Sequence, residues 1–336
     1  MANNKFSDVV VRLTGSLPNV SIGLGIPLIL VKTADTSDSF VPKLKKFYSL
    51  EEVNSDYTTG TDVNTVAKTV FDQEARPDHV SVLEFKTLPN DLTTFWNEDW
   101  TFALLATPNA SDAAALSMAV EQTGFKFAVV QVEKASEVAA VGGQMWTIVT
   151  VLPKANGRLD AAIVGAIGSL QVGSQNWKFK SVKDVTPYDD VTTVEYDAID
   201  RANAITYVSR GGQPTTTSGH VANGQYIDEM HGRIWIKVNT EKALMGVLNK
   251  NDKVPYNAAG ISLLQGELSN VLETAYQNGI IETGADTKGW YSVGASSRAA
   301  QTDDDILKRV YSGLTFSYMP SSSIDKVVVS GTVELP

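Results

Sequence analysis

Few residues of the chain combine types and spacings that could support catalysis or metal binding. The chain has three histidines, His79, His220 and His231, and the last two are eleven positions apart. A zinc site needs three or four converging ligands. The chain has no cysteine, so thiolate metal sites and disulfides are excluded. The sequence therefore predicts no metal and no other cofactor.

Three short motifs resemble catalytic or phosphate-binding signatures only superficially. "GLGIP" at 23–27 has two glycines, but it precedes an expected strand, whereas a dinucleotide loop follows one. "GGQPTTTSG" at 211–219 lacks the lysine of a phosphate loop. Ser323 and Lys326 have Ser-x-x-Lys spacing, but three positions along a strand place side chains on opposite faces. No enzyme is predicted, although an α/β enzyme using scattered Asp, Glu and Tyr stays an open alternative.

Composition and charge restrict the kinds of partner. The net charge is −10 and the isoelectric point is about 4.9, which argues against direct binding to nucleic acid. The densest basic stretch, Lys43, Lys45 and Lys46, is followed by Glu51 and Glu52 and is interpreted as a solvated helix face. The apolar run at 22–31 is too short to span a bilayer, and no secretion signal opens the chain. We therefore expect that the protein does not insert into a membrane and that it is synthesised in a reducing cytoplasm.

The first half of the chain alternates apolar strands with helices. Ser111 is the expected N-cap of the Ala-rich helix at 111–124, and Gly124 is its expected stop. Such alternation predicts an α/β layer with helices against a largely parallel sheet. The expected strands are 26–33, 79–85, 100–107, 125–132 and 145–153, and the expected helices are 61–75, 111–124 and 158–170.

The second half has a different order of elements after a charged stretch at 180–190, where Pro187 interrupts any regular element. A helix at 194–202 runs into a strand. The best amphipathic helix lies at 258–279, with Gly279 as its stop, and strands follow at 290–295 and 313–320. Its apolar face carries Ile261, Leu264, Leu268, Val271 and Ala275. The predicted fold is therefore an α/β layered domain at 21–190 followed by an α+β domain at 191–322.

Both ends of the chain have the two-residue period of a half-buried strand. Edge strands of this kind offer a template for pairing with another strand. The two ends could pair within one molecule, or each could pair with another copy. The N-terminal residues are Val9, Val10, Val11, Arg12 and Leu13, and the C-terminal ones are Val327, Val328, Val329, Val333 and Leu335.

Several segments together resemble contractile tail sheath proteins of bacteriophages, in particular the smaller sheath-like family of myophages. The longest is 227–281, from "IDEMHGRIWIKV" to "YQNGII". The opening strand "DVVVRLT", the "GLGIPLIL" strand, "FYSLEEV", "RPDHVSVLEF" and the closing "TFSYMPSSSIDKVVVSGTVEL" are also similar to that family. The resemblance covers nearly the whole chain, but none of its motifs is diagnostic alone.

The resemblance implies a structural subunit of a phage tail, assembled in the cytoplasm of a host bacterium. The arms, 1–20 and 323–336, would complete small β-sheets on neighbouring copies and so build a helical homopolymer. The α/β domain would lie outside, and the domain at 191–322 would face the tail tube, with contraction driving tube penetration and genome ejection. Further partners would be the tube, baseplate and tail terminator proteins.

The tube contact expected from this resemblance is weak and polar. Its candidate residues are Lys250, Lys253, Glu267 and Glu273, which could instead be simply solvated. A tail tube or baseplate subunit is the closest alternative function.

Overall fold

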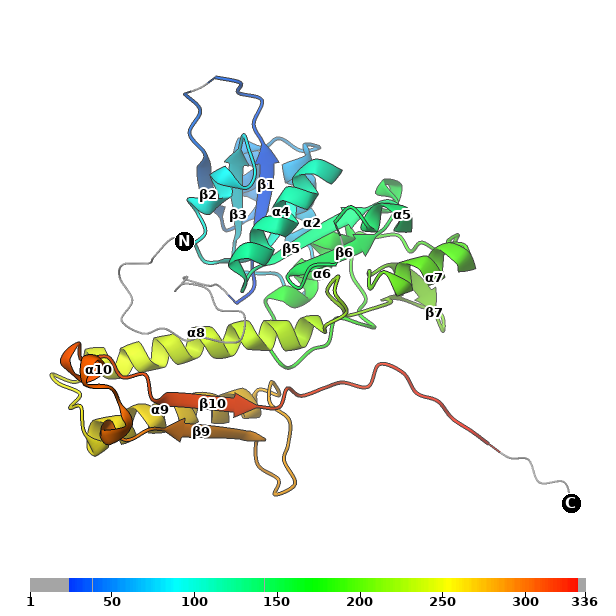
Figure 1. Ribbon diagram of the computed structural model, residues 1–336. Helices are drawn as coiled ribbons and strands as arrows, with labels where there is room; N and C mark the ends of the chain where they lie inside the picture. The colour runs from blue at the N-terminus through cyan, green and yellow to red at the C-terminus, as the bar shows by residue number, and fades with distance from the viewer. Residues whose placement is uncertain (1–23, 38, 142, 332–336) are drawn as a thin grey trace, which may run out of the picture.

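The computed structural model describes residues 24–331 except 38 and 142 (Figure 1). The arm residues Val9 to Leu13, and Val333 and Leu335 at the other end, lie outside the described residues. None of the helices in the described part of the chain is long and apolar enough to cross a membrane.

A six-stranded sheet forms the centre of the larger unit (Figure 1). Its order is β2-β3-β1-β4-β5-β6, and the neighbouring strands run parallel except for the antiparallel pair of β2 and β3. Helices cover the sheet, which confirms the predicted α/β layer. The bounds are β1 Ile26–Lys32, β2 Lys43–Phe47, β3 Val80–Phe85, β4 Trp100–Leu105, β5 Phe127–Val132 and β6 Thr147–Val151.

The lysine-rich stretch forms strand β2 and not the helix face that its charge pattern predicts. Lys43 and Lys45 point to solvent from this strand, while Phe47 is buried. The five residues of β2 pair with β3, and their side chains alternate between exposed and covered. This two-residue period is that of a strand and determines the structure here, whatever the charge pattern. The edge of the large sheet therefore carries lysines.

The three helices that the sequence predicts in this unit are present as α2, α4 and α6, and the short helices α1, α3 and α5 are additional. Thr61 caps α2, and Gly124, with φ of 71°, ends α4. The N-cap of α4 is Asn109 and not Ser111, because the Asn109 side chain accepts the N–H of Asp112 at 2.9 Å. The bounds are α1 Leu50–Asp56, α2 Asp62–Phe71, α3 Asn90–Thr93, α4 Ala110–Thr123, α5 Ala135–Val138 and α6 Leu159–Ile163, which continues as a π-helical turn over Val164–Gly168.

Residues 193–222 pack with the large sheet. Ile205 bridges to Thr150 at the outer edge of β6, and Ile199 and Ala222 share a buried cluster with Val149. The unit built on the sheet therefore runs past residue 190, where the change in composition predicts a boundary. This segment contains α7 Thr193–Arg201, β7 Tyr207–Arg210 and β8 Gln213–Thr216.

Helix α8 (Ile227–Lys250) connects the larger unit to a smaller one (Figure 1). Near its start, Met230 and Ile234 belong to the main core, while Trp235 and Ile236 belong to the core of the smaller unit. The smaller unit, which we call the C-terminal unit, contains the predicted helix and both predicted strands. Its elements are α9 Ala258–Gln277, β9 Tyr291–Ala295, α10 Asp303–Leu307 and β10 Leu314–Tyr318.

Candidate assembly surfaces

Strands β9 and β10 form an antiparallel two-stranded sheet with one packed face. Val293 and Phe316 lie against the cluster that includes Leu268 of α9. The opposite face carries exposed small side chains, namely Ser292, Gly294, Thr315 and Ser317. Within the described residues each strand pairs only with the other, so each has one unpaired edge. Such edges are templates for an additional strand.

These two strands lack the residues that usually block an edge. Neither YSVGA nor LTFSY contains a charged residue or a proline. Lysines and prolines on edge strands disfavour unwanted pairing, and the edge strand β2 of the large sheet carries such lysines. The β9–β10 sheet is therefore open to strand addition.

The chain leaves β10 along the C-terminal unit and then extends away from the body (Figure 1). The N–H of Met319 donates to the carbonyl of Trp290 and that of Ser321 to the carbonyl of Ile280, at 3.0 Å each. Residues 322–331 form neither helix nor strand. Three consecutive residues in this segment have highly exposed side chains, Val327 at 75%, Val328 at 79% and Val329 at 86%. A segment with a strand-forming sequence therefore lies in solvent and pairs with no strand in the described part of its own chain.

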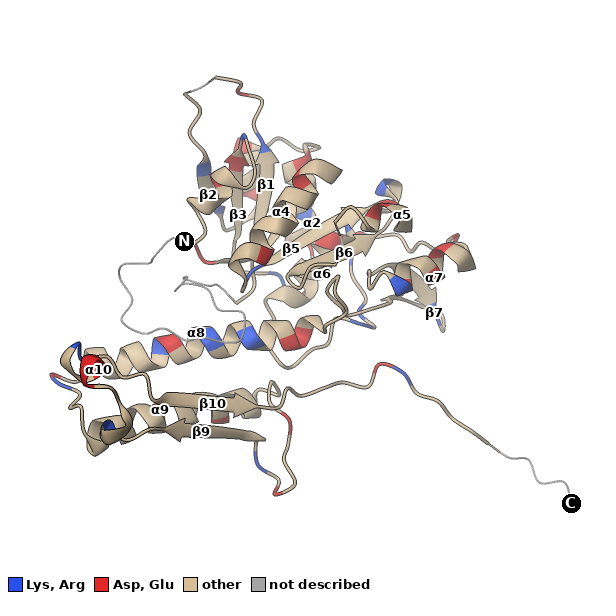
Figure 2. Ribbon diagram, in the orientation of Figure 1, with Lys and Arg blue, Asp and Glu red and all other residues tan. Residues whose placement is uncertain are grey.

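The residues expected to face a tube do not form one surface. Lys250, the last residue of α8, and Lys253, in the turn after it, are exposed. Figure 2 shows that charged residues of both signs lie along this helix. Glu267 and Glu273 are half-buried and six positions apart, which places them about 120° apart around α9. Glu273 accepts the hydroxyl of Tyr291 at 2.9 Å. Burial and then this carboxylate raise the pKa of Tyr291 to about 12. Glu273 therefore holds α9 to β9, a role that spacing alone did not reveal.

A cavity of about 560 Å³ lies beside the carboxyl ends of β4 and β5. In a doubly wound sheet this is where ligands commonly bind. However, two of its three cationic side chains are already engaged: Lys68 lies 3.1 Å from Asp184, and Arg158 holds Asp160 at 2.7 Å. If the chain were an enzyme, this cavity would be the candidate substrate site. The two ion pairs reduce the capacity of the cavity to bind an anionic substrate.

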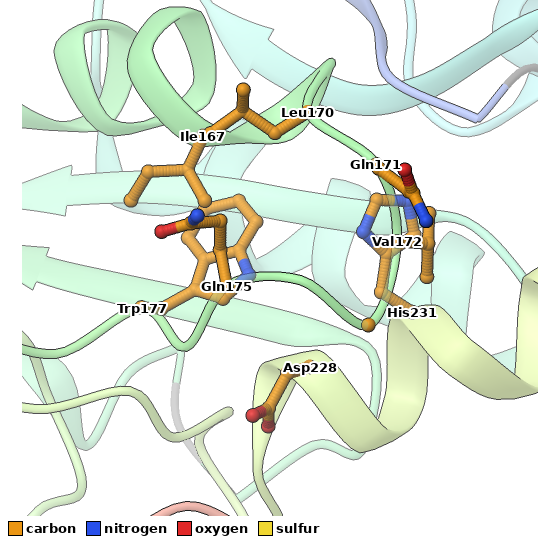
Figure 3. A pocket seen from close by; sticks show the side chains of 9 residues that line it. Ile167, Leu170, Gln171, Val172, Gln175, Trp177, Asp228 and His231 are labelled. Carbon is orange, nitrogen blue, oxygen red and sulfur yellow. The ribbon is translucent and has the colours of Figure 1, made fainter. Parts of the chain in front are cut away.

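A narrow crevice at the start of α8 contains two titratable groups, Asp228 and His231 (Figure 3). Burial raises the pKa of the Asp228 carboxyl to about 6. The imidazole of His231 is buried beside Phe102, and its Nε2 lies 3.1 Å from the carbonyl oxygen of Leu24. Burial lowers the pKa of His231 to about 4. Both groups gain a proton as pH falls, but burial favours the protonated form of the Asp228 carboxyl and the unprotonated form of the His231 imidazole.

Comparison with known families identifies the C-terminal part of the chain. Residues 227–333 match the family described as the E217 tail sheath protein gp31-like, C-terminal domain. The resemblance to contractile tail sheath proteins is confirmed. The match begins at the first residue of α8 and includes the β9–β10 sheet and the segment that follows it. No curated protein sequence matches the chain.

Solved structures extend the likeness, as a likeness of fold, to nearly the whole chain. A chain of the anti-feeding prophage baseplate in the contracted state is 14% identical, with a TM-score of 0.72, covering 96% of this chain and 98% of that chain. A chain of the contracted sheath of PVC, an extracellular contractile injection system, is 12% identical, with a TM-score of 0.70 and coverage of 99% and 98%. The sheath tail protein Lin1278 from Listeria innocua is 10% identical, with a TM-score of 0.57 and coverage of 90% and 93%. The fold class is thereby confirmed.

Proposed function

We propose that the chain is a structural subunit of a contractile sheath, in a phage tail or a phage-like injection particle, and not an enzyme. One observation carries this proposal. The same chain contains a strand-forming segment without a partner, 326–331, and a two-stranded sheet with open, uncharged edges. Polymerisation by strand addition requires that each molecule carry both a strand that it can donate and a sheet edge that can accept one.

The acceptor of the C-terminal segment is the β9–β10 sheet of another copy. In its own subunit the segment extends away from that sheet (Figure 1). A donor on one surface and an acceptor on another make a head-to-tail contact. Such a contact grows a helical filament when the rotation between copies does not close a ring. The sheath fold of the chain supports a helical tube as the product.

The remaining parts of the proposal follow from the likeness to sheath proteins. The N-terminal arm, 1–20, would donate a second strand, and 323–336 would form the C-terminal arm. The C-terminal unit would face an inner tube, with Lys250, Lys253 and Glu267 as candidate contacts. The α/β unit would lie outside and move during contraction, which drives the tube into its target. Tube, baseplate and terminator proteins would be the partners.

Removal of residues 326–336 tests the proposal. We expect the shortened chain to keep its melting temperature, because residues 326–331 are exposed, and to stay small in sedimentation and electron microscopy. The full chain should form tubes under the same conditions. Long tubes from the shortened chain would contradict strand donation by this segment.

A further inference from the structure

The C-terminal segment is held against the α/β unit around one residue, Asp325. From 322 to 331 every residue is exposed except Asp325. The side chain of Asp325 is 14% exposed, whereas its neighbours Ile324 and Lys326 lie in solvent. Nearby, the Asn176 amide reaches the hydroxyl of Ser323 only at 3.5 Å. A segment that is otherwise exposed is therefore fixed at a single covered position beyond the backbone pairing of Ser321.

Lys178 makes this contact from the α/β unit. Its ammonium donates to the carbonyl oxygen of Asp325 at 3.1 Å and lies 3.9 Å from Oδ2 of the same residue. The Lys178 side chain is 18% exposed, so solvent screens this pair less than a surface ion pair. The preceding residue, Trp177, is 2% exposed and packs on Phe102 of β4. The main core therefore holds the backbone that carries Lys178.

We propose that Lys178 positions the C-terminal segment. By holding Asp325, it sets the point and the direction in which the chain from Lys326 onward leaves the subunit. The inference rests on the proposed function, in which this segment reaches a second copy. A strand that is presented in a fixed direction loses less conformational freedom when it binds. The α/β unit, and not only β10, then directs the arm, so a movement of that unit carries the arm with it.

Distances between two labels test the anchor in the full-length chain before it polymerises. The chain has no cysteine, so Val194→Cys on α7 and Val328→Cys beyond the anchor give two specific label sites. Both side chains are exposed, Val194 at 78% and Val328 at 79%. We expect a narrow distance distribution in the parent and a broad one in Lys178→Met. Lys178→Arg keeps a cationic donor for the Asp325 carbonyl and should retain the narrow distribution.

Two further variants serve as matched controls for the anchor. Asp325→Asn removes the charge from the segment itself, where folding of the core is not at risk, but keeps the main-chain carbonyl that Lys178 holds, and should broaden the distribution less than Lys178→Met does. Lys308→Met breaks an exposed ion pair with Asp304 on α10 and should leave the distribution narrow. A broad distribution in the parent, or a narrow one in both anchor variants, would overturn the proposal.

Polymerisation by the unlabelled chains gives the functional readout. Lys178→Met should polymerise more slowly than the parent, on the order of tenfold, because a freely moving tether lowers the effective concentration of the strand. Lys178→Arg should polymerise at a rate close to that of the parent, and an unchanged rate in Lys178→Met would refute the positioning role. If the chain without 326–336 still forms tubes, the proposed function is wrong, but the label distances still decide whether Lys178 holds the segment.

Discussion

The two sheets of the molecule treat their edges in opposite ways. In the six-stranded sheet, the edge strand β2 carries Lys43, Lys45 and Lys46, and the other edge, β6, is bridged by Ile205. In the two-stranded sheet, β9 and β10 carry no charge and no proline, and within the described residues each leaves one edge unpaired. One chain therefore blocks pairing at one sheet and permits it at the other.

This difference assigns separate tasks to the two units. A sheet that is covered by helices and closed at both edges is a stable body that does not associate by strand addition. A small sheet with open edges is only marginally stable by itself, and it relies here on α9 for an apolar face. An added strand would supply further pairing where it is missing. The open sheet is thus suited to assembly, and the closed sheet to rigidity.

The largest expected effect comes from charging the open sheet. Ser292→Lys combined with Ser317→Lys places two cations on neighbouring strands, where the parent has two hydroxyls 2.8 Å apart. The two ammonium groups repel each other and block the close approach of a third strand, so strand addition should fail. We expect tubes to be lost in electron microscopy, while circular dichroism of the subunit stays unchanged.

The converse variant removes the block from the closed sheet. Lys43→Thr with Lys45→Thr leaves β2 without its exposed charges and should cause association that does not depend on residues 326–336. Sedimentation of chains with and without that segment separates the two kinds of association. If the β2 variant stays as soluble as the parent, the lysines are not what closes this edge.

Helix α9 packs against the apolar face of the open sheet. Substitutions on the buried face of α9 are the next test. Leu268 is 1% exposed in the cluster below β9 and β10, so Leu268→Ala should cost about 2 to 5 kcal/mol of unfolding free energy. Leu264 is only half-buried, at the edge of this packing, and Leu264→Ala should cost less. Urea unfolding of the chain without 326–336 measures both. Equal, negligible costs would mean that α9 does not support the sheet.

Helix α8 links the closed and the open sheet and carries a buried carboxyl near its start. The pKa of Asp228 is raised to about 6 by burial, so its ionised form destabilises the fold at pH 7. This cost is absent below the ordinary value of 3.8 and grows as pH rises to 6. Asp228→Asn should therefore stabilise the chain on the order of 1 to 3 kcal/mol at pH 7 and hardly at all at pH 4. Urea unfolding at several pH values gives the difference between variant and parent.

His231 makes the opposite contribution and sharpens this test. Its pKa is lowered to about 4, so the stability that its neutral form contributes is lost as pH falls from 6.5 towards 4. In the parent the two groups oppose each other between pH 4 and 6, and Asp228→Asn should reveal the loss caused by His231. The exposed Asp304→Asn is the matched control. A gain in the Asp228 variant that is the same at every pH would mean that its charge is not the cause.

Local sequence patterns predict most of the individual strands and helices, but they do not predict contacts between residues far apart in the chain. The strands of the large sheet other than β2, the start of α2 at Thr61 and the helix α9 follow from periodicity and capping residues within short windows. The packing of 193–222 depends on Ile205 meeting Thr150, and the anchor joins Lys178 to a residue 147 positions away. Neither contact leaves a local signal. The open edges of β9 and β10 cannot be predicted from the sequence, because the sequence of one strand does not show which strands pair with it.

The smallest expected effect separates the two carboxylates of α9. Glu273 is engaged with Tyr291 of the open sheet, so Glu273→Gln should loosen that sheet and lower the pKa of Tyr291 from about 12, which an ultraviolet titration detects. Glu267 lies on another side of α9, and the proposed function makes it a candidate contact to a tube. Glu267→Lys should leave the unfolding free energy unchanged but weaken assembly on isolated tubes by about 0 to 1 kcal/mol per contact, and added salt should imitate the effect. Equal weakening of assembly without tubes would place Glu267 between sheath subunits, and the distinction between a structural and a partner-facing carboxylate would then be wrong.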